Sequence, residues 1–440
     1  MKVTKKLLAL LMATMMVVST AACSAPKADT AAPSAEGDTA ASGEKKVVNV
    51  WAWDVEFNIP VMNEAKARYE AKHPDVTINV QEYSYDDVVQ KLNTNLTSGV
   101  NDGLPEIVLC EDPNIQKNLT SYPGAFYDLT DKIDFSKFAS YKVKTLTMDG
   151  KVYGVPFDMG TEGMFYRTDY LEQAGYTADD LKDITWSQFI EIGKKVKEKT
   201  GKAMLTLDPN SVNIIRDIMW STGTWYFDEN GNINIANNPS IIEGAKVYKS
   251  LMDSGIVKLT TGWGEMVAAL NNGDVASITT GCWIIPSIKA EPTQSGKWAV
   301  THMPRLEVEG GTNYGNRGGS SWLVLKNAPN SDIAADFLNE TFSSDADLYQ
   351  TILRSVGAIG TYLPAASGEE YSKGQEFFGG QKIFSDFSEW AGKVPSINFG
   401  IYSDEADSFL VTGMNEIINN GADINTTLKS VEDQLKQQIQ

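Results

Sequence analysis

The chain has 440 residues, of which 42% are hydrophobic and 10% aromatic, so it can bury a large core divided between two lobes or domains. It carries 38 basic and 57 acidic residues, a net charge of -19, which argues against nucleic acid as a partner. The same acidity argues against electrostatic docking on anionic lipid, so any membrane association has to come from a covalent anchor or a spanning segment.

The N-terminus has the pattern of an export signal. A basic start over residues 1–6 precedes an apolar stretch too short to span a bilayer, and small residues lead into Cys23. The run Thr20-Ala21-Ala22-Cys23 resembles the bacterial lipobox, in which the cysteine is acylated and becomes the new N-terminus, although Leu is commoner where Thr20 stands. We therefore expect residues 1–22 to be a lipoprotein signal peptide and Cys23 to be lipidated. A plain secretory signal cut near Ala22 is the alternative, and both readings export the protein.

A low-complexity segment follows the cysteine. Residues 24–44 are rich in Ala, Ser, Thr, Pro, Gly and acidic residues and lack hydrophobic periodicity, so we expect residues 23–45 to form a lipidated, disordered tether. Beyond it only Cys110 and Cys282 remain. Their separation fits neither a disulfide framework nor metal-ligand spacing. We expect two small buried thiols, and we predict neither a metal site nor a cofactor.

Strand and helix patterns alternate through the first part of the chain. The expected order is a strand at 47–53, a helix at 61–72, a strand at 76–83, a helix at 86–98 and a strand at 107–110. This β-α-β-α-β order predicts a mostly parallel sheet whose ligands lie beyond the carboxyl ends of the strands. The residues at those ends are Trp51, Trp53, Asp54, Glu56, Glu111 and Asp112.

A second α/β region begins after Tyr153. Thr185 and Gln188 form a capping box that opens a helix ending at Lys199. An Asn230-Gly231 hairpin is expected between the next two helices. The further expected helices are 212–221, 240–253, 265–272, 331–342, 405–419 and 427–439, and the expected strands are 203–207, 275–279, 298–303 and 321–325.

One stretch has the character of a family signature. It runs Gly150-Lys151-Val152-Tyr153-Gly154-Val155-Pro156-Phe157-Asp158 and continues to Phe165-Tyr166-Arg167. This stretch resembles the signature of carbohydrate-specific extracellular solute-binding proteins of bacterial ABC importers, which are relatives of the maltose-binding protein. Other segments that resemble the family are Asn272-Gly273-Asp274-Val275-Ala276, Thr280-Gly281-Cys282-Trp283, Gly318-Gly319-Ser320-Ser321-Trp322 and residues 330–342. Together with the lipobox and the first strand, they cover nearly the whole chain.

The resemblance implies an α/β, two-lobed fold of the type II periplasmic-binding-protein class, with a hinge and a ligand cleft between the lobes. It places the first hinge crossing near 153–158 and a return near 304–314. Lobe 1 would then hold residues 46–155 and about 305–355, and lobe 2 residues 156–304 and about 356–440. Hinge closure around the ligand is implied as well.

The same resemblance implies the function and the partners. The protein would be a monomeric lipoprotein receptor on the outer face of the cytoplasmic membrane, without enzymatic activity. It would bind a neutral mono- or oligosaccharide and deliver it to the permease subunits of an ABC importer, which works with a cytoplasmic ATPase. The motifs do not distinguish one sugar from another.

A sugar receptor needs aromatic rings that stack on C–H faces and polar groups around the hydroxyl rim. The chain has ten tryptophans, and each can alternatively be core packing; we favour the core for Trp186, Trp263, Trp298 and Trp390. Nearby glycines favour Trp283 and Trp322 as cleft residues. The candidate ligand-binding residues are Trp53, Asp54, Glu56, Glu111, Asp112, Asp158, Trp220, Trp225, Trp283, Gly319, Trp322 and Arg354, with Asn58 and Arg167 as further hydrogen-bond donors.

Two other classes of protein remain as alternatives. A secreted glycoside hydrolase could pair any two of Asp54, Glu111 and Asp158. The only histidines, His73 and His302, have no spacing typical of a triad or a zinc site, and no phosphate-binding glycine motif is present. A calcium-stabilised adhesion module could use the residues around Asn230-Gly231, namely Asp228, Asn230, Asn232 and Asn234. These lack the glycine and distal glutamate of an EF-hand, which favours a hairpin turn.

Overall fold

The structure is a computed structural model that describes residues 45–439. The predicted signal peptide, the predicted lipidation site Cys23 and all but the last residue of the predicted tether lie outside this range. Within residues 45–439, no helix is long and apolar enough to cross a membrane.

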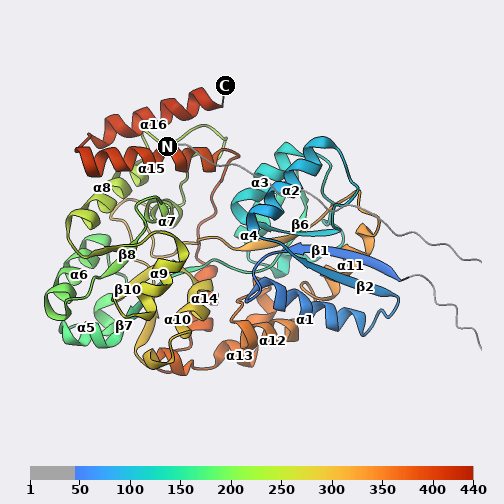
Figure 1. The fold of residues 1–440 in the computed structure, drawn as a ribbon, viewed down its shortest axis with the longest axis horizontal. Coiled ribbons are helices and arrows are strands. Elements are labelled where there is room, and N and C mark those ends of the chain that lie inside the picture. The colour runs from blue at the N-terminus through green and yellow to red at the C-terminus, as the bar shows by residue number, and fades with distance from the viewer. Residues whose placement is uncertain (1–44, 440) are drawn as a thin grey trace, which may run out of the picture. The chain divides into compact units, whose positions relative to one another are not determined.

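A five-stranded sheet forms the first framework (Figure 1). Strand β1 is parallel to both of its neighbours, β2 and β3, and β12 runs antiparallel to β3 and β6. The predicted parallel arrangement is thus confirmed for the first three strands. In spatial order the strands are β2 (Val76–Glu82), β1 (Lys46–Ala52), β3 (Ile107–Glu111), β12 (Ser320–Val324) and β6 (Gly154–Pro156).

Both faces of this sheet are covered, which explains its nearly continuous apolar strands. Val48 and Val50 pack in one core, and Trp51 packs in another with Val88 and Leu92. In Figure 1, α1 (Asn58–Glu70) lies on one side of β1 and β2, and α2 (Tyr85–Ser98) and α3 (Asp112–Ser121) lie on the other.

Two smaller sheets form the second framework. The strand β7 lies between β10 and β11 and is antiparallel to both, while β8 and β9 are parallel. The predicted capping box is confirmed, because Gln188 N donates to Thr185 Oγ1 at 3.2 Å and Thr185 N donates to Gln188 Oε1 at 2.9 Å. The strands are β7 (Glu162–Arg167), β8 (Leu205–Leu207), β9 (Val257–Leu259), β10 (Ser277–Gly281) and β11 (Trp298–Thr301). The helices of this part are α5 (Thr168–Gln173), α6 (Trp186–Thr200), α7 (Asn213–Ser221), α8 (Pro239–Asp253), α9 (Gly262–Asn271), α10 (Ile285–Lys289), α15 (Ser403–Asn420) and α16 (Ile424–Gln438).

Several short elements complete the described chain. The expected turn at Asn230-Gly231 is present, with Asp228 N donating to Asn232 O at 2.9 Å. The helices between 346 and 391 have no counterpart among the sequence-based expectations. The remaining elements are α4 (Ser140–Thr145), β4 (Thr147–Met148), β5 (Lys151–Val152), α11 (Ser331–Glu340), α12 (Ala346–Val356), α13 (Glu369–Ser372), α14 (Ile383–Ala391) and single turns of 3-10 helix at Phe135–Lys137, Ala178–Leu181, Cys282–Ile284, Pro292–Gln294, Leu363–Ser367 and Glu376–Phe378.

Three segments lie where the two frameworks meet, and we call them the crossing segments: 157–161, 315–319 and 357–361. They lie side by side, because Arg317 N donates to Gly160 O at 2.8 Å and Met159 N donates to Ile359 O at 3.1 Å. A Cβ atom on Gly160 would lie 2.1 Å from the Arg317 carbonyl oxygen, so this approach requires glycine. The predicted lobe boundaries and hinge positions remain predictions.

Candidate functional site

A cavity of about 650 Å³ lies at the carboxyl ends of β1 and β3, where it also meets the second framework. Its position agrees with the rule that open α/β sheets bind ligands beyond their strand ends. From the first framework the lining includes Trp53, Asp54, Glu56, Phe57, Asn58 and Glu111; from the crossing segments and their edges, Asp158, Arg317, Gly318, Gly319 and Ser320; and from the second framework, Thr206, Asp208, Asn213, Arg216, Tyr248, Trp263, Met266 and Trp283.

The loop after β1 is shaped by Asp54. This residue has a left-handed φ of 67°, and its Oδ1 accepts hydrogen bonds from Glu56 N at 2.9 Å and Phe57 N at 3.1 Å. The loop brings Asn58, the first residue of α1, to the cavity, where its buried Oδ1 has no partner among the described residues. Trp53 lines the cavity and is held edge-on by Tyr85, with ring centroids 5.2 Å apart. Of the two tryptophans considered for this strand, only Trp53 lines the cavity.

Two carboxyl groups form the polar floor. Glu111 ends β3, and burial raises its pKa above the ordinary value, although the Tyr85 hydroxyl favours the charged form. Asp158 lies in the first crossing segment, and its Oδ1 accepts from both Ser320 N and Ser320 Oγ at 2.7 Å. These bonds fix Ser320 and leave Asp158 Oδ2 at the cavity without a protein hydrogen bond among the described residues.

Asp112 lies beneath this floor and does not line the cavity, contrary to expectation. It is 1% exposed because it begins α3 directly under the crossing segments, where it pairs with the buried Lys142 at 2.7 and 2.6 Å. Burial raises the pKa of Asp112 to about 6 against the attraction of Lys142. Lys142 also donates to Ser320 O at 2.9 Å. Gly319 does line the cavity, with a φ of 89°, and a Cβ atom there would lie 3.0 Å from Asp112 Oδ2.

An aromatic wall faces the floor. Trp283 Nε1 donates to Arg317 O at 2.9 Å, and the Trp283 ring lies 5.5 Å from the ring of Trp263. Trp263 was expected in the core but is 51% exposed. It occupies the first turn of α9, whose start is fixed by Gly262 N donating to Asp208 Oδ2 at 2.8 Å. The glycines on either side of Trp263 are the sequence signal that could have placed it at a helix start.

Three other predicted cleft tryptophans lie in apolar cores. Trp322 is the third residue of β12 and is 0% exposed between Phe157 and Phe342, because the strand continues past it. Trp220 donates from Nε1 to Pro395 O at 2.9 Å and packs against Trp225. Trp225 is 1% exposed and borders a different cavity of about 500 Å³.

The arginines that line the cavity are not the arginine that was predicted from the sequence. Arg354, which was expected, lies outside the cavity and pairs with Glu370 at 3.2 Å. Arg216 and Arg317, which were not expected, line the cavity. Each has a carboxylate partner: Arg216 contacts Asp407 at 3.0 Å, and Arg317 contacts Asp217. Arg317 directly precedes the Gly318-Gly319 motif, a sequence signal that could have identified it.

The two cysteines of the described chain are buried free thiols, as expected. Burial raises the pKa of Cys110 to about 12 and that of Cys282 further still. Both therefore remain protonated and unreactive at neutral pH.

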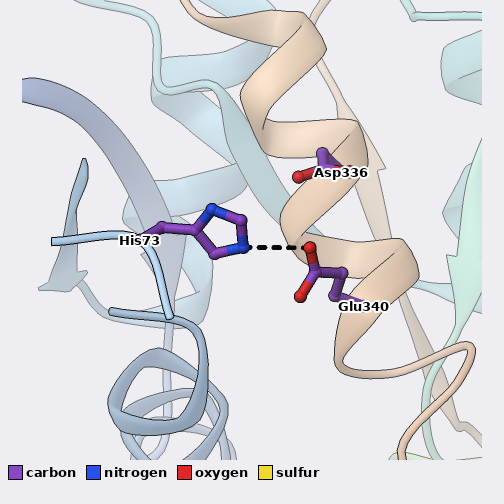
Figure 2. A group of neighbouring side chains, drawn as sticks. All are labelled: His73, Asp336 and Glu340. Carbon is purple, nitrogen blue, oxygen red and sulfur yellow. Dashed lines mark hydrogen bonds and ion pairs between the residues drawn. The ribbon is translucent and has the colours of Figure 1, made fainter. Parts of the chain in front are cut away.

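One group of side chains within residues 45–439 has the chemistry of metal ligands (Figure 2). The donor atoms of His73, Asp336 and Glu340 lie within 4.8 Å of one another. Each carboxylate already has protein partners, however: Glu340 contacts His73 at 2.9 Å and Lys72 at 3.5 Å, and Asp336 accepts from Tyr69 at 2.8 Å. Figure 2 shows His73 pointing at Glu340 on the neighbouring helix, so these contacts explain the group as a polar link between α11 and the end of α1 with the turn that follows it.

Comparisons with known proteins identify the family. The sequence pattern of bacterial extracellular solute-binding proteins matches residues 64–379. The chain belongs to this family. The solute-binding protein is 47% identical over 393 residues to the lactose-binding protein of Rhizobium radiobacter, a match that covers 89% of this chain and 93% of the relative. It is 28% identical to the arabinooligosaccharide-binding protein of Bacillus subtilis (strain 168), with 69% and 71% of the two chains covered.

Solved structures agree on the fold. The sugar-binding protein MalE from Xanthomonas citri superposes with a TM-score of 0.73 at 17% identity, covering 89% of the solute-binding protein and 97% of MalE. The predicted family and the predicted α/β type II fold are therefore confirmed. Because the family consists of binding proteins, the hydrolase alternative has no support.

Proposed function

We propose that this solute-binding protein captures lactose, or a closely related neutral disaccharide, outside the cell and delivers it to the permease of an ABC importer. The observation that carries the proposal is the 47% identity to a lactose-binding protein over nearly the full length of both chains. The chemistry of the cavity supports the same ligand class.

The cavity offers both kinds of contact that a disaccharide needs. Trp53, Trp263 and Trp283 supply apolar ring surfaces, and Glu111 and Asp158 supply acceptors for hydroxyl groups. Micromolar binding requires about -8 kcal/mol, whereas each aromatic stack adds only ~0.5–1.5 kcal/mol beyond its buried area. Several of these groups must therefore contact the sugar together, which favours closure of the two frameworks around it.

The distribution of charge supports a neutral ligand. Five carboxyl-bearing residues line the cavity: Asp54, Glu56, Glu111, Asp158 and Asp208. The two lining arginines are each paired with a carboxylate behind the wall, so they offer hydrogen-bond donors with little free positive charge. A sugar acid would meet like charge in this cavity.

The proposal extends to the location and assembly of the protein. The predicted export signal and lipobox support anchoring through an acylated Cys23 on the outer face of the cytoplasmic membrane. A monomeric receptor anchored in this way would stay at the membrane, where the permease lies.

The test is calorimetric titration of the protein with lactose, cellobiose, galactose and lactobionate, followed by chromatography of each mixture. Cellobiose differs from lactose only in the configuration at C4 of the non-reducing sugar, and lactobionate carries an open-chain, negatively charged gluconate in place of the reducing glucose. We expect one-to-one binding of intact lactose, weaker binding of cellobiose and galactose, and none of lactobionate. Absence of lactose binding would refute the proposal, and cleaved sugar would restore the hydrolase alternative.

A further inference from the structure

Arg317 occupies a position shared by the cavity and the crossing segments. Its backbone lies in the second crossing segment, where its N–H donates to Gly160 O at 2.8 Å. Its carbonyl accepts from Trp283 Nε1 at 2.9 Å. The two residues that follow, Gly318 and Gly319, both have positive φ and line the cavity. Any rotation of the crossing segments would therefore move Arg317, Trp283 and the glycine turn together.

The side chain of Arg317 is anchored in the second framework. Nε donates to Asp217 Oδ1 at 2.9 Å, Nη2 donates to Asp217 Oδ2, and Nη1 donates to Thr280 Oγ1 at 3.4 Å. Asp217 belongs to α7 and is 1% exposed, and the equally buried Glu162 lies 3.4 Å from Nε. Burial and the adjacent Asp217 carboxylate raise the pKa of Glu162 well above its ordinary value, so Asp217 is the counter-ion of Arg317.

This anchoring leaves donors for a ligand. A guanidinium group has five N–H donors, and the contacts with Asp217 and Thr280 use three of them. The side chain is 19% exposed and lines the cavity. One Nη1–H and one Nη2–H therefore remain for oxygen atoms of a ligand. The two hydrogen bonds with the Asp217 carboxylate fix the plane of the guanidinium group and thus the direction of these two donors.

We propose that Arg317 is the residue that couples occupancy of the cavity to closure of the two frameworks, and that Asp217 is its positioning residue. The inference rests on the proposed function, because it requires a sugar in the cavity. A hydroxyl group bound to both Arg317 and the acceptors of the opposite floor bridges the second framework to the end of β3. Because Arg317 also belongs to a crossing segment, this bridge stabilises one particular arrangement of the crossing segments.

The alternative is a purely structural ion pair. In that case Arg317 and Asp217 would stabilise the fold, and their replacement would lower the unfolding temperature without a specific effect on closure. The two roles differ in what they predict for the sugar-bound state, which can be measured directly.

The experiment compares Arg317→Lys, which keeps the positive charge beside Asp217, with Arg305→Lys, a matched control that lies outside the cavity in the chain between β11 and β12. Spin labels on cysteines introduced at the exposed Gln90 and Ser250 report the distance between α2 and α8. Within residues 45–439 the native cysteines, Cys110 and Cys282, are buried, and Cys23 is replaced by Ser in every variant so that only the introduced pair is labelled. Calorimetry gives the dissociation constant for lactose, and a thermal melt confirms folding of each variant.

We expect lactose to shorten the label distance in the wild type and in Arg305→Lys. In Arg317→Lys the dissociation constant should rise about tenfold or more, as for the loss of one or two hydrogen bonds, and saturating lactose should no longer give the short distance. Asp217→Asn should weaken lactose binding in the wild-type background but add no further loss to Arg317→Lys, because it acts through the same guanidinium.

Normal affinity and normal closure in Arg317→Lys, with a wild type that binds lactose, would overturn the inference and leave the proposed function intact. If Arg317→Lys does not fold, the test uses Asp217→Asn instead. An unchanged dissociation constant of Asp217→Asn for lactose would then overturn the inference. A wild type that does not bind lactose would overturn the proposed function itself, together with the coupling built on it.

Discussion

Replacement of Lys142 by Met tests the buried ion pair under the cavity floor. Lys142 is 0% exposed and Asp112 1% exposed, so the substitution leaves a carboxylate in an apolar setting without its counter-ion. Loss of one partner of such a pair costs ~3–5 kcal/mol. Met has nearly the length of the Lys side chain, so no large cavity contributes to this loss. We expect the free energy of unfolding at pH 7 to fall by that amount.

The raised pKa of Asp112 also predicts how the loss of unfolding free energy in Lys142→Met changes with pH. Burial raises the pKa of Asp112 to about 6, above its value of about 3.9 in an unfolded chain. A carboxyl group whose pKa is raised by folding contributes stability that is complete below the unfolded pKa and is lost as the pH rises through the folded pKa. Without Lys142 the folded pKa rises further, so the deficit of Lys142→Met should shrink as the pH is lowered from 7 towards 4.

The assay is equilibrium unfolding in urea at several pH values. The control is Lys182→Met, which removes an exposed ion pair with Asp179 and should cost less than ~1 kcal/mol. A double variant, Lys142→Met with Asp112→Leu, should recover most of the loss because no uncompensated charge remains. A deficit of Lys142→Met below about 1 kcal/mol at pH 7, or one that grows at low pH, would refute this reasoning.

Three further predictions concern the cavity. Trp263→Ala should weaken lactose binding in calorimetry by at least the ~0.5–1.5 kcal/mol of the lost stacking, because the apolar area that the ring buries against the sugar is lost as well, and it should change the unfolding temperature little. Leu363→Ala, which removes an equally exposed side chain away from the cavity, should leave the affinity unchanged. Equal effects of the two variants would contradict the assignment. Lactose affinity should begin to fall on acidification at a pH above the ordinary pKa of glutamate, because the raised pKa of Glu111 lets this acceptor take up a proton there. Glu111→Gln should make the affinity less dependent on pH. An unaltered pH dependence in this variant would exclude Glu111 as its source. Gly319→Ala should destabilise the protein by ~1–3 kcal/mol, and by more than Gly296→Ala. Both glycines have positive φ, but only at Gly319 would the added Cβ atom lie 3.0 Å from the Asp112 carboxylate. Equal midpoints of thermal unfolding for the two variants would show that this contact costs nothing.

The residues at the strand ends could be predicted from the sequence. Alternation of strand and helix predicts which edge of a parallel sheet faces the ligand, and Trp53, Asp54 and Glu111 line the cavity as expected. Asp158, which was expected from the family signature, lines it as well. Trp322 was misplaced because a Gly-Gly motif marks a turn but does not show how far the following strand runs. Trp263 was missed because the exposure of a single aromatic residue is set by tertiary structure, here by the bond between Gly262 and Asp208 that fixes the start of α9.

The contacts of the charged residues also depend on tertiary structure, so they could not be predicted from the sequence. The sequence offered Asp112 as a ligand contact, but only the fold brings Lys142, which lies 30 positions later, onto its carboxylate. Arg216 and Arg317 carry no periodic signal that separates a cavity wall from solvent. Their positions depend on partners in α7 and α15, which are distant in sequence from the crossing segments.

The location of Trp263 has a consequence for how such receptors diverge. Half of its surface is in water, and its ring contacts Trp283 at the edge of a core rather than within one. Replacement of this residue therefore alters the shape of the cavity while Trp186, Trp298 and Trp322 continue to hold the frameworks. We expect that a few substitutions along this wall can change which sugar is bound, and that the crossing segments and the floor need no accompanying change.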